Sequence, residues 1–132
     1  VIPSIISKID KAVKERKDKV HLWGTGQPSR EFLYVKDAAE GILLATEHYN
    51  KSEPINLGTG KETTIHDLAH LIATLMNYTG ELIFNPQKPD GQPRRSLDIR
   101  KAKKEFYFKS ITPLKTGLIE SINWYQKQSD IP

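Results

Sequence analysis

Apolar residues recur along the chain at the spacing of amphipathic helices. Such stripes begin at residues 2, 38, 65 and 114. Apolar positions three or four residues apart lie on one face of a helix, and that face can pack on a core. The stripes consist of Ile2, Ile5, Ile6, Ile9 and Val13, then Ala38, Ile42, Leu43 and Ala45, then Ile65, Leu68, Leu71, Ile72, Leu75 and Met76, and finally Leu114, Leu118, Ile122 and Tyr125.

Polar residues stand where these helices are expected to start. Asp37 is placed to cap a helix that continues to residue 49, and Thr64 to cap the next helix, with an acid three positions further on. That spacing is typical of a capping box. Asp98 is expected to cap a shorter, basic helix that ends near residue 106.

Short apolar runs between the helices predict four strands, at residues 20–23, 31–35, 54–58 and 82–84. The order strand, helix, strand from residue 31 to residue 58 predicts a parallel β-α-β crossover. The expected fold is an α/β lobe with α+β character, built from short strands and amphipathic helices. Residues 1–132 are expected to form a single domain. It would lack a Rossmann core, because neither Gly-x-Gly string continues into the Gly-x-Gly-x-x-Gly fingerprint.

Composition and charge narrow the class of protein. Hydrophobic residues at 37% and charged residues at 27% fit a globular domain and exclude a disordered one. No apolar run reaches the roughly 18 residues of a membrane span. The absence of cysteine excludes disulfides and thiolate zinc sites within the chain and fits the cytoplasm, the expected location. Residues 85–104 hold seven basic residues and two acids, which indicates an anionic partner.

Two loops rich in glycine and proline place arginine beside aromatic or acidic residues. The first loop follows Trp23 and leads to Arg30, and the second contains Arg94 and Arg95. Guanidinium groups bind phosphates bidentately, and an indole can pack on a sugar or a base. An ordinary explanation exists for each residue, namely a core position for the tryptophan and surface ion pairs for the arginines. The residues alone therefore leave ligand binding open.

Other candidate sites are weaker. His66 and His70 lie four residues apart, as in the zinc-protease helix, but Asp67 replaces the glutamate base and no third ligand is evident. Both histidines fall outside the apolar stripe, so we expect a solvated helix face and no metal. The basic helix after Asp98 permits nucleic-acid binding, but no recognised binding module or aromatic stacking platform accompanies it. We expect no nucleic-acid partner and no membrane partner.

Three sequence strings resemble those of the extended short-chain dehydrogenase/reductases, within the NAD-dependent epimerase/dehydratase family. WGTGQPSREFLYVKD, from Trp23 to Asp37, and NLGTG, from Asn56 to Gly60, are shared by many nucleotide-sugar epimerases and dehydratases. KPDGQPRRSLD, at residues 88–98, is narrower and resembles the GDP-L-fucose synthase group. The resemblance covers essentially the whole chain in order.

The resemblance implies that residues 1–132 are the C-terminal, substrate-binding lobe of such an enzyme. The substrate-binding residues that it implies are Trp23, Arg30, Lys88, Asp90 and Arg95. Arg30 would lie near the phosphates of a GDP-sugar, Arg95 stands where the family often has lysine, and Asp90 would contact a ribose or shape the turn. The implied complete enzyme is a homodimer that epimerises GDP-4-keto-6-deoxymannose at C3 and C5 and reduces C4 with NADPH.

The chain departs from the family in its catalytic groups. No tyrosine is followed four positions later by lysine, and the family's cysteine and histidine epimerisation pair is absent. We therefore expect no catalytic residue and no cofactor site here, and no activity without an upstream Rossmann half that binds NADP. Two alternatives remain. One is the lobe of a 4-epimerase or 4,6-dehydratase for UDP or dTDP sugars, and the other is a non-catalytic nucleic-acid-binding or interaction module.

Overall fold

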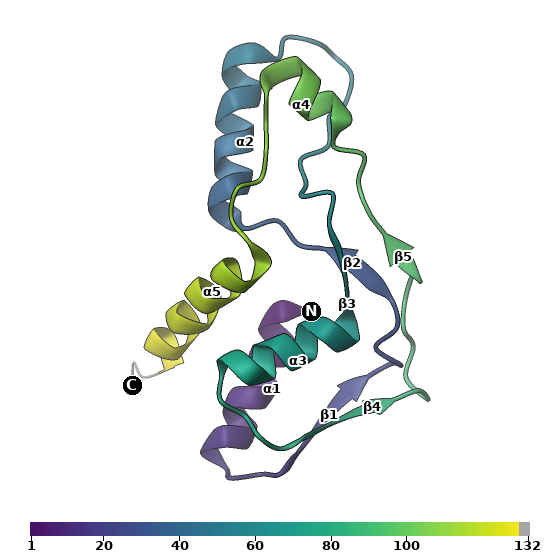
Figure 1. The fold of residues 1–132 in the computed structure, drawn as a ribbon, viewed down its shortest axis with the longest axis vertical. Helices are drawn as coiled ribbons and strands as arrows, with labels where there is room; N and C mark the ends of the chain where they lie inside the picture. The colour runs from purple at the N-terminus through teal and green to yellow at the C-terminus, as the bar shows by residue number, and fades with distance from the viewer. Residues whose placement is uncertain (130–132) are drawn as a thin grey trace.

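The computed structural model describes residues 1–129, which form five helices and five short strands (Figure 1). In chain order they are α1 (Ile2–Lys14), β1 (Lys19–Trp23), β2 (Ser29–Glu31), α2 (Val35–His48), β3 (Glu62–Thr64), α3 (Ile65–Leu75), β4 (Glu81–Asn85), β5 (Arg94–Arg95), α4 (Arg100–Phe106) and α5 (Leu114–Ser129). Short strands alternating with amphipathic helices confirm the expected fold class.

The strands form two small sheets along one side of an elongated body. β1 and β4 pair in parallel, and β2 lies between β3, which is antiparallel to it, and β5, which is parallel to it. In Figure 1, α1, α3 and α5 gather at one end of the molecule, α2 and α4 lie at the other end, and the three-stranded sheet lies between them. Residues far apart in sequence therefore meet at β2.

Each end of the molecule has its own hydrophobic cluster. The larger cluster joins α1, α3, α5 and β1, and it buries Ile9, Leu68 and Ile72 completely. The smaller cluster places Phe106 and Phe108 against α2 and the segment after it. The predicted stripes of α1, α3 and α5 supply most of the larger cluster, which confirms their assignment. Val13 is exposed at the end of α1, and the stripe predicted for α2 is wrong in part, because its Ile42 and Leu43 are exposed.

The helix starts follow the sequence unevenly. Thr64 caps α3 as predicted, since its hydroxyl oxygen accepts a hydrogen bond from the Asp67 backbone N–H at 3.0 Å. Asp98 lies one residue before the cap of α4 and accepts from the Arg100 N–H at 3.0 Å. The Arg100 side chain also bonds this carboxylate and lowers the pKa of Asp98 to about 2.

The prediction that Asp37 caps α2 is wrong, because the helix begins two residues earlier and Tyr34 is its cap. Asp37 is 6% exposed, and its carboxylate accepts four hydrogen bonds from the segment before α5. The donors are the side chain of Ser110, the backbone N–H of Ile111, and both the N–H and the hydroxyl of Thr112. Asp37 thus fastens α2 to the start of α5.

Two strand predictions need correction. The strand expected at residues 31–35 is β2 at Ser29–Glu31, because α2 takes over at Val35. The apolar run 54–58 forms no strand, since among the described residues it has no neighbouring strand to receive its backbone hydrogen bonds. β3 forms further on and pairs antiparallel with β2, so the parallel crossover predicted for residues 31–58 is wrong. The parallel pairs are β1–β4 and β2–β5.

Candidate functional site

The three-stranded sheet places two arginines side by side. Arg30 on β2 and Arg95 on β5 are register partners in the parallel pair. Partners in a parallel ladder point to the same face, and both side chains line one hollow of about 180 Å³ together with Glu31, Gly58 and Leu97, among others. Like charges directly opposite each other destabilise a sheet. An arrangement of this kind therefore favours an anion between the guanidinium groups.

Glu31 is next to Arg30 in sequence, yet its carboxylate is occupied by backbone groups. It accepts hydrogen bonds from the N–H of Thr59, from the N–H of Gly60 at 2.8 Å and from the N–H of Leu97 at 3.0 Å. Burial raises the pKa of Glu31, but these N–H donors outweigh burial and hold the pKa below its usual value. Glu31 therefore forms no ion pair with either arginine, although its negative charge lines the same hollow.

Arg94 has a different environment from its neighbour. Because successive strand residues point to opposite faces, Arg94 faces away from Arg95. Its guanidinium pairs with Glu62 on β3 through Nη2 at 2.5 Å and through Nε, and Glu62 also accepts from the Ser29 hydroxyl at 2.7 Å. The guanidinium is the largest cause of the lowered pKa of Glu62. Arg94 is thus neutralised within the sheet.

The guanidinium groups of Arg30 and Arg95 have no such partner. Arg30 donates from Nη1 to the backbone oxygen of Ser29 at 2.6 Å, and the turn at Gly91 lies next to its Nη2. Over residues 1–129, neither Arg30 nor Arg95 forms an ion pair with a carboxylate. Two guanidinium groups that share one hollow and form no ion pair with a carboxylate can bind a phosphate or diphosphate.

The loop that leads to β5 joins this hollow to a second one. Trp23, at the end of β1, is 66% exposed, and the Lys88 Nζ lies 5.6 Å from the centroid of its indole ring. Asp90 accepts hydrogen bonds from the Thr25 N–H at 2.6 Å and from the Thr25 hydroxyl at 2.8 Å. The contact is close, since a Cβ on Gly24 would lie 2.2 Å from the Asp90 carboxylate. Asp90 therefore shapes the turn that presents Trp23.

The second hollow has a volume of about 410 Å³ and is lined by Trp23, Asp90 and residues of α1. Lys8 on α1 is among them, and its Nζ donates to the backbone oxygen of His21 at 2.9 Å. Sequence reasoning missed Lys8, because one lysine on the polar face of an amphipathic helix carries no signal of its own. The five predicted residues thus form two neighbouring groups. Trp23, Lys88 and Asp90 make one, and Arg30 and Arg95 make the other.

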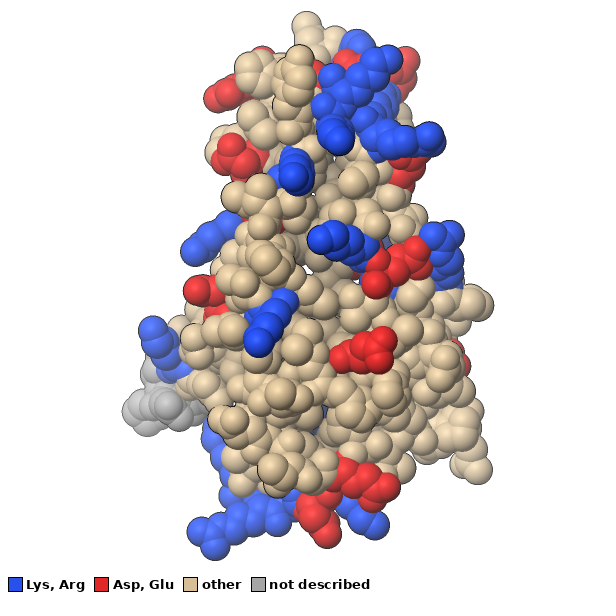
Figure 2. Space-filling model, viewed as in Figure 1, with Lys and Arg blue, Asp and Glu red and all other residues tan. Residues whose placement is uncertain are grey.

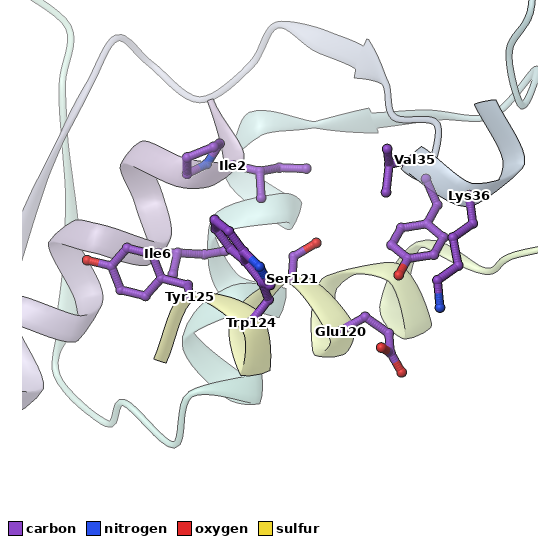
Figure 3. A pocket seen from close by; sticks show the side chains of 10 residues that line it. Ile2, Ile6, Val35, Lys36, Glu120, Ser121, Trp124 and Tyr125 are labelled. Atoms are coloured by element: carbon purple, nitrogen blue, oxygen red, sulfur yellow. The ribbon is translucent and has the colours of Figure 1, made fainter. Parts of the chain in front are cut away.

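A third hollow, of about 560 Å³, lies elsewhere, between α1, the start of α2 and α5 (Figure 3). Its walls are mainly apolar, with Ile2, Ile6 and Trp124 on one side and Val35 on the other, and Lys36 and Glu120 near its edge (Figure 3). None of the predicted substrate-binding residues lines it. Exposed apolar surface that is rimmed by polar groups typically marks an interface with another protein surface.

The histidine pair lies on the exposed side of α3, as predicted. The rings of His66 and His70 are tilted against each other with centroids 4.2 Å apart, and both stack on Phe84. In the part of the chain that the structure describes, no three histidine, cysteine, aspartate or glutamate side chains gather as a metal would require. We expect no metal site here because two histidines without a third ligand do not complete one.

Several basic side chains in and around α4 pair with acids, among them Arg100 with Asp98. Lys101 pairs with Glu53 at 3.2 Å, and Lys51 pairs with Glu105 at 2.6 Å. Figure 2 shows the blue side chains at this end of the molecule interspersed with red ones. A nucleic-acid surface needs a continuous positive stripe, so this pattern disfavours that alternative. No helix within residues 1–129 is both long enough and apolar enough to cross a membrane.

Comparison with known proteins gives one consistent result. Residues 1–58 match the NAD dependent epimerase/dehydratase family. Over 125 residues the chain is 39% identical to a protein named probable GDP-L-fucose synthase 1 from Oryza sativa subsp. japonica, and this match covers 95% of the chain and 38% of the rice protein. The chain thus spans well under half the length of this relative.

Solved structures share the fold. A GDP-L-fucose synthetase from Naegleria fowleri bound to NADP matches with a TM-score of 0.92 and 28% identity, over 99% of the chain and 41% of that protein. A UDP-glucose 4-epimerase from Thermotoga maritima with UDP-glucose matches with a TM-score of 0.85 and 26% identity, over 98% of the chain and 40% of the epimerase. The lobe is therefore shared by proteins that are named for different nucleotide sugars.

Proposed function

We propose that residues 1–132 are the nucleotide-sugar-binding lobe of an enzyme like GDP-L-fucose synthase, because residues 1–58 match the NAD dependent epimerase/dehydratase family and the chain is similar to a protein named probable GDP-L-fucose synthase 1. The complete enzyme would epimerise GDP-4-keto-6-deoxymannose at C3 and C5 and reduce the C4 ketone with hydride from NADPH. This lobe binds the nucleotide sugar and contributes no catalytic residue. By holding the ligand in place, it contributes orientation to the rate of both steps.

The observation that carries the proposal is the arginine pair. Arg30 and Arg95 share one hollow, while the two acids nearest them bind backbone groups and Arg94 instead. The negative charges of a diphosphate would supply the ion-pair partners that these two guanidinium groups do not have in the protein. Among the relatives, the names GDP-L-fucose synthase and UDP-glucose 4-epimerase both refer to a diphosphate ligand or product.

The neighbouring hollow supplies the ring contacts. Trp23 offers an exposed indole face, and Lys88 and Lys8 bring positive charge to its rim. We assign the guanosine or the sugar to this face and the diphosphate to the arginines. Asp90 acts through the turn, since its carboxylate is occupied by Thr25. Together with Arg30 and Arg95, these residues form the proposed substrate site.

The partner of the lobe is the cofactor-binding half of the same enzyme. The apolar hollow at Trp124 and Val35 continues along α2, where Ile42 and Leu43 are also exposed. A face of this size and composition fits an intramolecular domain interface. NADP binds to that other half, and the chain alone binds no cofactor. The homodimer contact of the complete enzyme also belongs to the other half.

A second candidate is the lobe of an enzyme that acts on UDP or dTDP sugars. The similarity to the Thermotoga maritima epimerase with UDP-glucose favours it, because the fold is common to both classes. The arginine pair suits any of these ligands, since all carry a diphosphate. The base is therefore the feature that separates the two candidates.

Calorimetric titration of the chain with GDP, UDP and dTDP at low salt tests the proposal. We expect GDP to bind most tightly, and weakly in absolute terms, because one lobe provides only part of the site. A Trp23→Ala variant should lose affinity for GDP and keep its affinity for inorganic pyrophosphate, which has no ring. Tighter binding of UDP or dTDP would favour the second candidate, and no binding of any diphosphate would refute both.

A further inference from the structure

The Glu31 carboxylate bridges two separate segments that surround the arginine hollow. One oxygen accepts from Thr59 and Gly60, in the loop after residue 58. The other oxygen accepts from the Leu97 N–H at 3.0 Å and from the Ser96 hydroxyl at 3.4 Å, immediately after β5. A single side chain on β2 therefore fixes both neighbours of the hollow.

The fit around this carboxylate leaves no spare room. A Cβ on Gly58 would lie 2.2 Å from the carboxylate oxygen of Glu31, so a side chain there would displace it. Leu97 lies two residues after Arg95, and the bond from its N–H holds the end of β5 against β2. The separation of the Arg30 and Arg95 guanidinium groups thus depends on where Glu31 holds this segment.

We infer that Glu31 is a positioning residue of the proposed diphosphate site. It sets the geometry of the two arginines and does not contact the ligand, because its oxygens are already occupied. This inference rests on the function proposed above. Glu31 thus belongs to the site although its negative charge repels an anionic ligand. Its contribution is the set of hydrogen bonds that hold the site together.

The two effects of Glu31 on binding have opposite signs. A carboxylate next to an anion site repels the anion, so if Glu31 acted through its charge alone, neutralising it would tighten binding by about two- to fivefold. If Glu31 acts by position, Glu31→Gln weakens binding, because glutamine offers one acceptor oxygen for donors on two segments. The direction of the change therefore separates the two roles.

The experiment is calorimetric titration of the chain and its variants with GDP and with inorganic pyrophosphate, at a temperature at which circular dichroism shows each variant folded. We expect Glu31→Gln to bind both probes about tenfold more weakly. Gly58→Ala keeps the Glu31 charge but displaces the carboxylate, and it should weaken both probes as well. Glu62→Gln is the matched control, since it removes a charge from the neighbouring strand and should leave binding equal or tighter.

Two results would overturn the inference. Tighter binding by Glu31→Gln would mean that the carboxylate acts through its charge, and unchanged binding by Glu31→Gln or by Gly58→Ala would mean that its position does not matter. If Glu31→Gln does not fold, the Gly58→Ala result decides alone. Failure of the unaltered chain to bind either probe would instead refute the proposed function, and with it the basis of this inference.

Discussion

Arg30 and Arg95 are register partners on adjacent parallel strands, and within residues 1–129 neither guanidinium is paired with a carboxylate. Two like charges at this spacing repel each other in the free protein. The sheet nevertheless pairs the neighbouring Arg94 with Glu62, so acids are available and are used elsewhere. An unneutralised pair of this kind fits a binding site whose missing charge arrives with the ligand.

This arrangement predicts a conflict between stability and binding. Arg95→Met removes the repulsion while keeping most of the aliphatic volume, so the free energy of unfolding should rise slightly without ligand and GDP binding should be lost. Urea denaturation with and without saturating GDP measures both effects. Arg94→Met is the control, because it breaks an ion pair and should lower stability while GDP still binds. A loss of stability in Arg95→Met would contradict the account.

Asp37 anchors α2 to the segment before α5 through four hydrogen bonds. Three of the four donors reach one oxygen of Asp37, and the Thr112 hydroxyl reaches the other. Asp37→Asn replaces the second oxygen with an NH₂ group and turns the remaining charge-assisted hydrogen bonds into weaker neutral ones. We expect the free energy of unfolding to fall by about 2–3 kcal/mol, as for other lost hydrogen bonds to a buried carboxylate. Chemical denaturation measures this, with the exposed Glu120→Gln as a control that should change little. Equal stability of the two variants would refute the anchor.

The same carboxylate predicts a pH dependence. Burial raises the pKa of Asp37, but the hydrogen bonds from Thr112, Ser110 and Ile111 outweigh it, and the pKa lies below its usual value in the folded chain. A lowered pKa adds stability above the pKa of the unfolded chain, about 4, and this stability is lost as the pH falls further. The stability difference between the native chain and Asp37→Asn should therefore be constant from pH 7 to about 5 and shrink below about 4. A difference that grows in acid would contradict this.

Gly24 controls the turn that presents Trp23. Its φ of +80° and the 2.2 Å approach of Asp90 to the position of a Cβ both exclude alanine. Gly24→Ala should therefore break the hydrogen bonds between Asp90 and Thr25, move Trp23 and Lys88, and weaken GDP binding about tenfold. Gly91→Ala is the matched control, because its φ is +76° but its Cβ would meet only the Arg30 Nη2 at 3.6 Å. Titration of both variants with GDP checks this, and similar binding by the two would contradict it.

The sequence predicts the helices and the Thr64 cap well, because both depend on local spacing. Prediction from the sequence fails where the local structure depends on a partner that is distant in the sequence. The run 54–58 has the composition of a strand but no strand beside it in residues 1–129, and the two-residue β5 exists only because β2 holds it. Asp37 resembles a cap in sequence, yet its partners lie more than 70 residues away.

The site shows the same limit. The motif string names both Arg94 and Arg95, but strand alternation and the distant Glu62 determine which of them is left unpaired. Neither the loop closed by Glu31 nor the place of Lys8 beside Trp23 follows from spacing along the chain. The substrate-binding roles of Trp23 and the arginines remain predictions that binding experiments test.

Calorimetric titration of GDP at one low ionic strength tests whether Arg30 and Arg95 together form a diphosphate site. It compares four proteins, namely the native chain, Arg30→Ala, Arg95→Ala and Arg94→Ala. All three variants lose one positive charge, but only the first two lose a guanidinium from the shared hollow. We expect Arg30→Ala and Arg95→Ala to bind GDP at least about tenfold more weakly, and Arg94→Ala to stay within about threefold of the native chain. Equal losses in all three variants would show that net charge alone attracts the nucleotide, and would contradict a diphosphate site built on Arg30 and Arg95.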